Sequence, residues 1–405
     1  MRSDQIRSTF LDFFGRRGHE EVPSGSLVPD EDDLLFTNAG MVQFKPYFLG
    51  LRKPPRPRLM SAQQCVRTVD IDRIGLTDRH ATAFEMLGNF AIGDYFKREA
   101  MAWALELLTD GYGLERDRLW MTVLGGDEES VALWRSMGVP EERIQPLGPD
   151  DNFWSMGVPG PSGPTSEIFY DRGRDKGRDG GPAVDSERFV ELWNLVFMQY
   201  RRGDSDDEIL GDLPGKHIDT GLGRDRMALV LQGVSNLQEI DVVAPTLRAV
   251  REATGRDDEP AAHRLVTDHL RTAVILVSAG VRPGNEGRGY VVRRLLRRAV
   301  RRLVLLGVDE PVLGGIAESV GGEQAREIVE KEERAFRRTL RAGNRLLDTE
   351  LRRGPLRGET VFKLHDTYGF PVDLTVEIAK ESGVAVDTAG FDRLMREHRE
   401  KSRRQ

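Results

Sequence analysis

The spacing of apolar residues changes near residue 240 of the chain. Before that point, short β-like runs such as Leu119–Leu124 and Phe189–Tyr200 alternate with loops rich in Gly, Pro and Asp and with helix-like stretches such as Ala100–Leu108. From Val242 onward, apolar residues recur every three or four positions, proline thins out, and Arg, Glu and Leu dominate. The pattern predicts an α/β domain over residues 1–240 and a mostly helical domain over residues 241–405.

Composition excludes several classes of protein. The 405 residues suffice for two or three domains, and no apolar run approaches a bilayer span or a signal peptide, so we expect a soluble, cytoplasmic protein with no membrane partner. The single cysteine, Cys65, excludes a disulfide framework and a multi-cysteine zinc site, and the seven histidines offer no metal-ligand pair at helical spacing. We therefore expect no bound metal site. A net charge of −7 argues against indiscriminate nucleic-acid binding but permits a local basic patch.

The segment Arg79–Lys97 mixes charged residues with aromatic rings and two glycines. This chemistry suits a polar pocket walled by rings, large enough to hold a nucleotide. A strand, a bend and a helix start would have the same texture, so the segment alone leaves both interpretations open.

Read together with eight further segments, Arg79–Lys97 resembles the second class-defining motif of alanyl-tRNA synthetases. Matching segments follow one another in the family's order over nearly the whole chain, which excludes chance. In chain order they are Val22–Pro29 with Leu35–Lys45, Cys65–Thr68, Arg79–Lys97, Asp151–Trp154, Gly160–Ile168, Leu192–Tyr200, Ile218–Arg226, Asn285–Val291 and Asp366–Asp373.

The resemblance implies a class II synthetase catalytic domain, built on an antiparallel sheet, followed by a mostly α-helical domain that recognises the tRNA acceptor stem. The implied substrates are L-alanine, ATP with Mg²⁺, and alanine tRNA. The alanine carboxylate attacks the α-phosphorus of ATP, pyrophosphate leaves, and the alanyl group then passes to the tRNA 3′ end. Such chemistry requires positioning and charge stabilisation more than a protein nucleophile.

Two arginines carry the phosphate chemistry in this resemblance. Arg67 matches the motif 2 arginine, whose planar guanidinium would hold the carboxylate and the α-phosphate together; from sequence alone, a strand-end salt bridge is the alternative. Arg226 would reach the γ-phosphate side. Phe84 would stack on adenine, with simple core burial as its alternative. The other residues that the resemblance places at ATP are His80, Trp154, Leu192, Trp193, Asn194 and Gly223.

The same resemblance places alanine between polar and apolar side chains. Asp219 would pair with the α-ammonium group, and Asn194 on a neighbouring strand would add a hydrogen bond. Trp154 and Val196 would wall a small side-chain pocket, although core burial is the commoner fate of a tryptophan. Gly221 belongs to a predicted glycine-broken turn between a strand and a helix beginning near residue 226, where backbone can approach a ligand closely. Such a pocket discriminates against glycine or serine by only about 1–3 kcal/mol.

Residues 282–302 predict one amphipathic helix with an arginine surface. Taken alone, its arginine spacing favours a solvated face paired with acidic residues elsewhere in the chain. The resemblance instead implies contacts with phosphates and with the identity base pair of the acceptor stem. The residues it assigns are Asn285, Arg288, Arg293, Arg297 and Asp373, with Asp366 as the alternative to Asp373.

The chain also departs from the family pattern. Full-length members carry an editing domain with a histidine and cysteine zinc site and a further C-terminal region; this chain has neither, so we expect a natural short form without protein-bound zinc. Ala83 stands where many members have a second phenylalanine, which predicts a larger cavity beside adenine. Arg224 and Asp225 replace the usual Leu-Glu of motif 3.

Three hypotheses follow. The first, which the arginine helix and Asn285 favour, is a tRNA-charging alanine ligase. The second is a short paralogue that transfers activated alanine to a small molecule or a protein, which Ala83 and the missing editing domain favour. The third is a non-catalytic tRNA-binding homologue, against which the intact set of Arg67, Asp219 and Arg226 argues.

Overall fold

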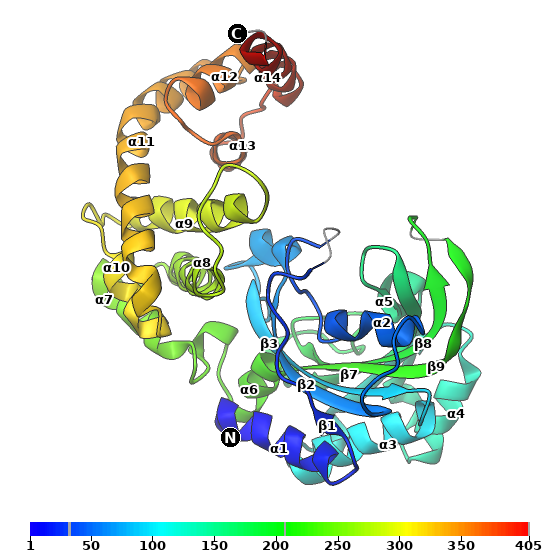
Figure 1. The fold of residues 1–405 in the computed structure, drawn as a ribbon. Coiled ribbons are helices and arrows are strands. Elements are labelled where there is room, and N and C mark those ends of the chain that lie inside the picture. The colour runs from blue at the N-terminus through cyan, green and yellow to red at the C-terminus, as the bar shows by residue number, and fades with distance from the viewer. Residues whose placement is uncertain (31–33, 206–207, 404–405) are drawn as a thin grey trace.

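A mixed sheet forms the first lobe of the computed structural model, which describes residues 1–30, 34–205 and 208–403 (Figure 1). Its nine described strands are β1 (Glu20–Glu21), β2 (Arg58–Val66), β3 (Ala83–Ile92), β4 (Leu119–Leu124), β5 (Ile144–Leu147), β6 (Phe153–Ser155), β7 (Gly160–Asp171), β8 (Phe189–Arg202) and β9 (Ile209–Gly223). Their spatial order is β1-β2-β3-β9-β8-β7-β4-β5, with β6 paired to β7. Only the β1–β2 and β4–β5 pairs of these strands are parallel.

Helices cover the sheet and then build a second lobe that arches away from it (Figure 1). Those of the first lobe are α1 (Ser3–Gly15), α2 (Lys45–Phe48), α3 (Lys97–Glu106), α4 (Glu128–Ser136), α5 (Pro149–Asn152) and α6 (Arg224–Gln232). Those of the second are α7 (Ala244–Thr254), α8 (Pro260–Ser278), α9 (Gly287–Leu305), α10 (Leu313–Ala317), α11 (Arg326–Arg353), α12 (Gly358–Asp366), α13 (Val372–Glu381) and α14 (Thr388–Arg403). No helix of the described residues is long and apolar enough to cross a membrane.

The two-residue period of the strands separates two apolar clusters. Leu195 and Phe197 of β8 join the buried side chains of α1 and α3 on one face of the sheet. Val196 and Met198 join Phe48 and its neighbours from α2 on the other face. Because alternate residues of a strand point to opposite faces, one strand supplies both clusters. The second of these clusters lies on the same face as the pocket described below.

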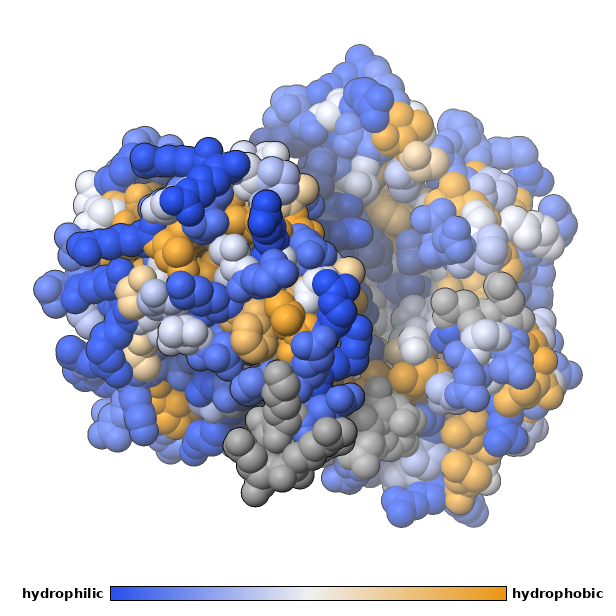
Figure 2. All heavy atoms as spheres, turned by 90° about the horizontal axis from the view of Figure 1, so that it is seen from above, coloured by the Kyte–Doolittle hydropathy of each residue, from blue (hydrophilic) through white to orange (hydrophobic). Residues whose placement is uncertain are grey.

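The helical lobe has its own apolar cluster, which extends to the sheet. The apolar positions of α9, such as Val292, Leu296 and Ala299, are buried in it together with residues of α8 and α11. Val66 and Ala83, at the end of β2 and the start of β3, belong to the same cluster. The two lobes therefore share a hydrophobic contact. Viewed from above, hydrophilic residues cover most of both lobes and a recess separates them (Figure 2).

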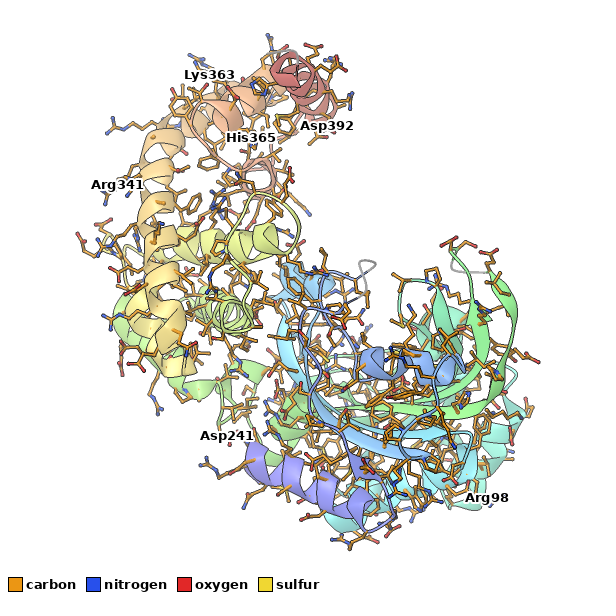
Figure 3. All side chains as sticks on the ribbon, in the orientation of Figure 1. Arg98, Asp241, Arg341, Lys363, His365 and Asp392 are labelled. Carbon is orange, nitrogen blue, oxygen red and sulfur yellow. The ribbon has the colours of Figure 1, made fainter. Side chains whose placement is uncertain are left out.

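The predicted fold class is confirmed. The run Leu119–Leu124 is β4, and the runs predicted around β8 and α3 overlap those elements. The turn predicted over Asp219–Gly223 is wrong, because β9 continues through Gly223 and α6 begins at Arg224. Residues 240 and 241 remain our proposed domain boundary. Asp241 lies between the lobes and accepts a hydrogen bond from the Ser3 backbone N (3.0 Å) (Figure 3).

We expect Gly163→Ala to destabilise the sheet where β7 bulges against β8. A Cβ at Gly163 would lie 2.0 Å from the Phe197 carbonyl oxygen, a backbone atom that cannot move aside as a side chain would. Overpacking of this kind costs about 1–3 kcal/mol, so the midpoint of thermal unfolding should fall by several degrees. Gly148→Ala is the matched control, since nothing lies within 4 Å of its Cβ position. Equal midpoints for the two variants would contradict the prediction.

Candidate active site

A pocket lies over the face of the sheet formed by β3, β7, β8 and β9. Strand alternation brings together Phe84 and Met86 of β3 with Asn194 and Val196 of β8. The residues that line the pocket are Ala39, Arg67, Asp70, Arg79, His80, Ala81, Phe84, Met86, Trp154, Glu167, Glu191, Leu192, Asn194, Val196, Asp219, Gly221, Gly223, Asp225, Arg226 and Leu237. All the residues that the sequence assigned to ATP and alanine are among them, except Trp193.

Trp193 lies on the opposite face of the sheet. Its ring is fully buried, with centroids 5.7 Å from Phe10 and 6.2 Å from Phe14 of α1. The assignment of its side chain to ATP is therefore corrected. The physical reason is the period of two in β8, which sends the side chains of residues 193 and 194 in opposite directions.

Three arginines form the cationic side of the pocket. Among the described residues, Arg67 forms no ion pair; its Nε donates to the Asn38 carbonyl oxygen (3.1 Å), and its guanidinium carbon lies 5.2 Å from the centre of the Phe84 ring. Arg226 Nη1 lies 2.6 Å from Glu191 Oε2. Arg79 Nε lies 3.3 Å from Glu187 Oε1. The guanidinium of Arg67 is thus available to an anionic ligand.

Two glutamates, Glu167 and Glu191, face these arginines. Burial, and next the negative charge of Glu191, raise the pKa of Glu167 well above its ordinary value. Burial alone would raise the pKa of Glu191 as well, but the Arg226 guanidinium outweighs it and lowers that pKa. Asn194 Nδ2 donates to Glu167 Oε1 (2.9 Å). Of these two glutamates, Glu191 is therefore neutralised by an arginine and Glu167 is not.

Asp219 is the second buried carboxylate without a matching cation. Its side chain is 5% exposed, and burial alone raises its pKa from an ordinary 3.8 to about 7. Beside it on β8, Asn194 Oδ1 is buried and receives no hydrogen bond from any described residue. Two acceptors left in this state are costly without a donor. A small cationic ligand would satisfy both.

Phe84 and Ala83 separate to opposite faces of β3. Phe84 lines the pocket, whereas Ala83 is 3% exposed in the apolar cluster shared with the helical lobe. Ala83 does not line the pocket, so the prediction that it enlarges a cavity beside adenine is wrong.

His80 is a neutral side chain of the pocket. Burial, and next Arg79, lower its pKa to about 3, and its Nδ1 lies 2.6 Å from Thr77 Oγ1.

The remaining wall is apolar and narrow. Trp154, Val196, Ala39 and Met86 contribute to it. A Cβ at Gly221 would lie 2.8 Å from Met86 Sδ. Glycine at this position therefore lets Met86 pack directly against β9 close to Asp219, so the wall beside this carboxylate is apolar and suits a ligand with a small apolar group.

Arg224 and Asp225 are held in a buried ion network under the pocket. Arg224 Nη1 lies 2.9 Å from Glu85 Oε2, and Arg224 Nε donates to Asp225 Oδ1 (2.8 Å). Glu85 also receives a hydrogen bond from Arg7 Nε (3.0 Å). The two residues that depart from the usual motif 3 thus neutralise each other where α6 begins, and only Asp225 lines the pocket.

A second, smaller cleft lies between α9 and α13. Three of the residues that the resemblance assigns to tRNA, Arg293, Arg297 and Asp373, line it. Arg293 Nη1 also donates to Oδ1 of the exposed Asn285. The cleft is lined by Tyr290, Arg293, Arg294, Arg297, Arg298, Pro371, Asp373, Leu374 and Glu377.

The two candidate aspartates lie apart. Asp366, at the end of α12, has Oδ1 3.6 Å from His398 Nε2 of α14. Only Asp373 lines the α9–α13 cleft. Arg288 lies outside the cleft as well, because its guanidinium donates to the carbonyl oxygens of Leu35 (2.7 Å) and Leu34 (3.1 Å) and so joins the two lobes.

Acidic residues of the chain pair with most of the α9 arginines. Arg293 Nε lies 2.8 Å from Glu332 Oε1 of α11, and Arg297 Nε lies 3.6 Å from the same atom. Arg301 and Arg302 bind Glu381 of α13. The pairing with acidic residues that the spacing predicts is confirmed, but the arginine face is largely a set of contacts between helices rather than a solvated surface.

Sequence reasoning missed several lining residues. Glu167 stands inside a segment that was recognised, and Glu191 is a charge within an otherwise apolar strand, which was an available signal. Arg79 also belongs to the recognised Arg79–Lys97 segment. Met86 belongs to the same segment and Ala39 to the recognised Leu35–Lys45 segment, but neither carries a charge that would mark it as a lining residue. Within the described part of the chain, no group of three or more His, Cys, Asp or Glu side chains is arranged to hold a metal ion.

The fold and the pocket define a member of the class II synthetases, and comparison with known proteins agrees. The family model for tRNA synthetases class II (A) matches residues 5–405, so the chain belongs to this family. The resemblance drawn from the motifs is confirmed.

Among curated relatives, the chain is 52% identical over 438 residues to the alanine–tRNA ligase of Streptomyces avermitilis, covering 100% of this chain and 49% of that protein. It is 50% identical over 439 residues to that of Thermobifida fusca, again covering 100% and 49%. The chain thus spans about half the length of these relatives. The structure of apo histidyl-tRNA synthetase from S. aureus has a TM-score of 0.36 at 12% identity, over 62% of this chain and 75% of that one.

We expect Asp219→Asn to remove a pH dependence of stability. In the wild type, folded Asp219 binds a proton between its ordinary pKa of 3.8 and about 7 that the unfolded chain does not, so stability falls as pH rises through this window and levels off above it. The variant lacks this loss. Its free energy of unfolding relative to wild type should increase by about 2–3 kcal/mol between about pH 5 and about pH 8.

Urea unfolding at several pH values measures the difference between the two proteins. Asp117→Asn serves as the control, because the Asp117 side chain is 92% exposed. A difference that stays constant with pH for Asp219→Asn would show that its carboxylate is already compensated in the folded chain.

Proposed function

We propose that the chain activates L-alanine with ATP to alanyl-adenylate and transfers the alanyl group to the 3′ end of alanine tRNA. The observation that carries the proposal is the buried carboxylate of Asp219 and the unsatisfied acceptor Asn194 Oδ1, which lie beside an apolar wall and opposite a cationic one. The names of the curated relatives support the same substrate.

Alanine would bind with its ammonium group between the two acceptors. The ammonium would donate to the Asp219 carboxylate and to Asn194 Oδ1, and the paired charge would then stabilise the ionised form of Asp219. The methyl group would face Val196 and Met86, and the absence of a side chain at Gly221 is what lets Met86 lie there. This arrangement turns the alanine carboxylate toward Arg67.

ATP would lie along the arginine side of the pocket. Arg67 would hold the alanine carboxylate and the α-phosphate together, as its fork of donors allows, and Phe84 would stack on the adenine. Arg226 would meet the terminal phosphates. In the reaction, a carboxylate oxygen forms a bond to the α-phosphorus while the bond to the bridging oxygen of pyrophosphate breaks.

Mg²⁺ fits the donor set next to these phosphates. Glu167 and Glu191 would hold it, because Mg²⁺ in such sites takes one or two carboxylates along with phosphate oxygens, and a cation would relieve the repulsion that raises the pKa of Glu167. Bound there, the ion would neutralise charge on the departing pyrophosphate.

The α9–α13 cleft would receive the acceptor stem. Asn285 and Asp373 would read base edges, while Arg293 and Arg297 would approach the backbone. A terminal ribose hydroxyl would then attack the alanyl carbonyl, and AMP would leave. We also propose that the protein works where tRNA is charged, in the cytoplasm.

We expect Arg67→Ala to lower alanine-dependent pyrophosphate exchange by about 10²–10³-fold, since one preorganised charged donor to the transition state is lost. Arg67→Lys should recover only part of the activity, because lysine cannot bind both groups in a fork. Arg98→Ala, an exposed arginine of α3 far from the pocket, is the control (Figure 3). Unchanged exchange in Arg67→Ala would refute the assignment of this residue.

The wild-type assays separate the three hypotheses. Exchange together with charging of purified alanine tRNA supports the proposal. If exchange occurs but tRNA stays uncharged, the acceptor is a small molecule or a protein. Absence of exchange would leave only a non-catalytic tRNA-binding homologue.

We expect Asp373→Ala to reduce kcat/KM for alanine tRNA by about 10–100-fold, the effect of losing one or two base contacts, while pyrophosphate exchange stays within about twofold. Asp366→Ala is the matched control, because this aspartate pairs with His398 outside the cleft. A larger loss in Asp366→Ala than in Asp373→Ala would exchange the two assignments.

A further inference from the structure

The segment 68–82 links the two strands that carry Arg67 and Phe84. It leaves the end of β2 through a short turn, Thr68–Arg73, and returns to the start of β3. Within it, Asp70, Arg79 and His80 line the pocket. The position of this segment therefore decides where one wall of the pocket lies.

From the helical lobe, α8 holds the second half of the segment. Arg264 Nη2 donates to the Gly75 carbonyl oxygen (2.8 Å), and Arg264 Nη1 lies 3.3 Å from Asp78 Oδ1. Asp268, which is 4% exposed, accepts hydrogen bonds from both the backbone N (2.8 Å) and Oγ1 (2.6 Å) of Thr82. Buried charge-assisted bonds such as these fix the return to β3 firmly.

Helix α9 holds the first half of the segment. Arg298 Nη1 donates to the Ile71 carbonyl oxygen (3.2 Å) and to Asp72 Oδ1 (2.9 Å). Arg294 Nη2 lies 3.2 Å from the same Asp72 oxygen. On its other side, Arg298 Nε lies 3.2 Å from Glu377 Oε2 of α13.

Arg298 therefore contacts both the α9–α13 cleft and the segment 68–82. Together with Arg294 and Glu377 it lines the α9–α13 cleft, and it also holds Asp72, five residues beyond Arg67 in the chain. A ligand that enters the cleft meets the same guanidiniums that hold the turn. The charge of Arg298 is divided among acceptors on both sides, so a change on one side alters its hold on the other.

We propose that Arg298 and Asp72 are positioning residues that couple occupation of the cleft by the acceptor stem to the placement of the segment 68–82, and so favour transfer of the alanyl group. This inference rests on the proposed function. The Asp72 side chain is 69% exposed, so its ion pairs contribute little to stability in themselves. A contact of small energetic weight at this position suits coupling better than it suits holding the fold together.

The variant Asp72→Asn tests the coupling in the full chain. Pyrophosphate exchange should stay within about twofold of wild type and KM for alanine tRNA within about threefold, whereas kcat for charging should fall about tenfold, within the usual range of coupling between sites. Asp72→Glu keeps the carboxylate and should recover most of the charging rate. Asp117→Asn, with the same change of charge at an exposed site elsewhere, should leave all three quantities unchanged.

Amide hydrogen exchange gives a readout that a purely structural role would not alter. In wild type, alanine tRNA should slow exchange in residues 68–82, and in Asp72→Asn this protection should be lost although tRNA still binds. Equal losses of pyrophosphate exchange and charging, a loss explained entirely by KM, or tRNA-induced protection unchanged in the variant would each overturn the coupling. If the wild-type protein catalyses neither pyrophosphate exchange nor the charging of alanine tRNA, the proposed function itself fails, and the coupling fails with it.

Discussion

The register between β8 and β9 is the constraint on which the pocket depends. It pairs Asn194 with Gly221 and Val196 with Asp219, so two acceptors, one glycine and one apolar side chain arise from four neighbouring positions of two strands. Because side chains alternate along a strand, a slip of one residue would send these groups into the core and bring Leu195 and Trp193 into the pocket. The core on the opposite face prevents the slip, since Trp193 is packed against α1. Packing on one face of the sheet thereby holds the chemistry on the other.

The pocket is arranged as an incomplete set of charges. Three arginines face more than one carboxylate, yet among the described residues no cation pairs with Asp219 and no carboxylate forms an ion pair with Arg67. Burying an unpaired carboxylate costs free energy in the empty protein, and a ligand with one positive and one negative end removes that cost at both ends. An amino acid has this form. The free energy lost by burying these charges in the empty protein would thus favour binding of a zwitterion that fits against the apolar wall.

Much of this could be predicted from sequence, because the recognised motifs contain the charged residues and strand periodicity orients them. Asn194 was assigned to a strand beside Asp219, and the structure pairs the two segments, although Asp219, expected in a turn, lies within β9. The failures have physical reasons. Trp193 was grouped with its neighbours in a motif, although alternation sends it to the core, and the effect expected of Ala83 ignored that residues 83 and 84 face opposite ways. Arg288 was assigned to tRNA through the resemblance, whereas its partners in the folded chain are the backbone oxygens of a loop more than 250 residues away.

The arginines of α9 show that the number of charges on a helix does not by itself predict what the helix binds. From spacing alone, a row of arginines on one helix predicts a face paired with acidic residues elsewhere, and only the family resemblance indicates a nucleic-acid surface. In the folded chain, Glu332, Glu377 and Glu381 already neutralise most of this row. Paired arginines add little to the counterion release that drives non-specific binding to phosphates. What they retain is position, because each pair fixes a guanidinium at the edge of the cleft. The proposed acceptor-stem cleft would therefore select its ligand by shape and by a few base contacts, which is consistent with a chain whose overall charge is negative.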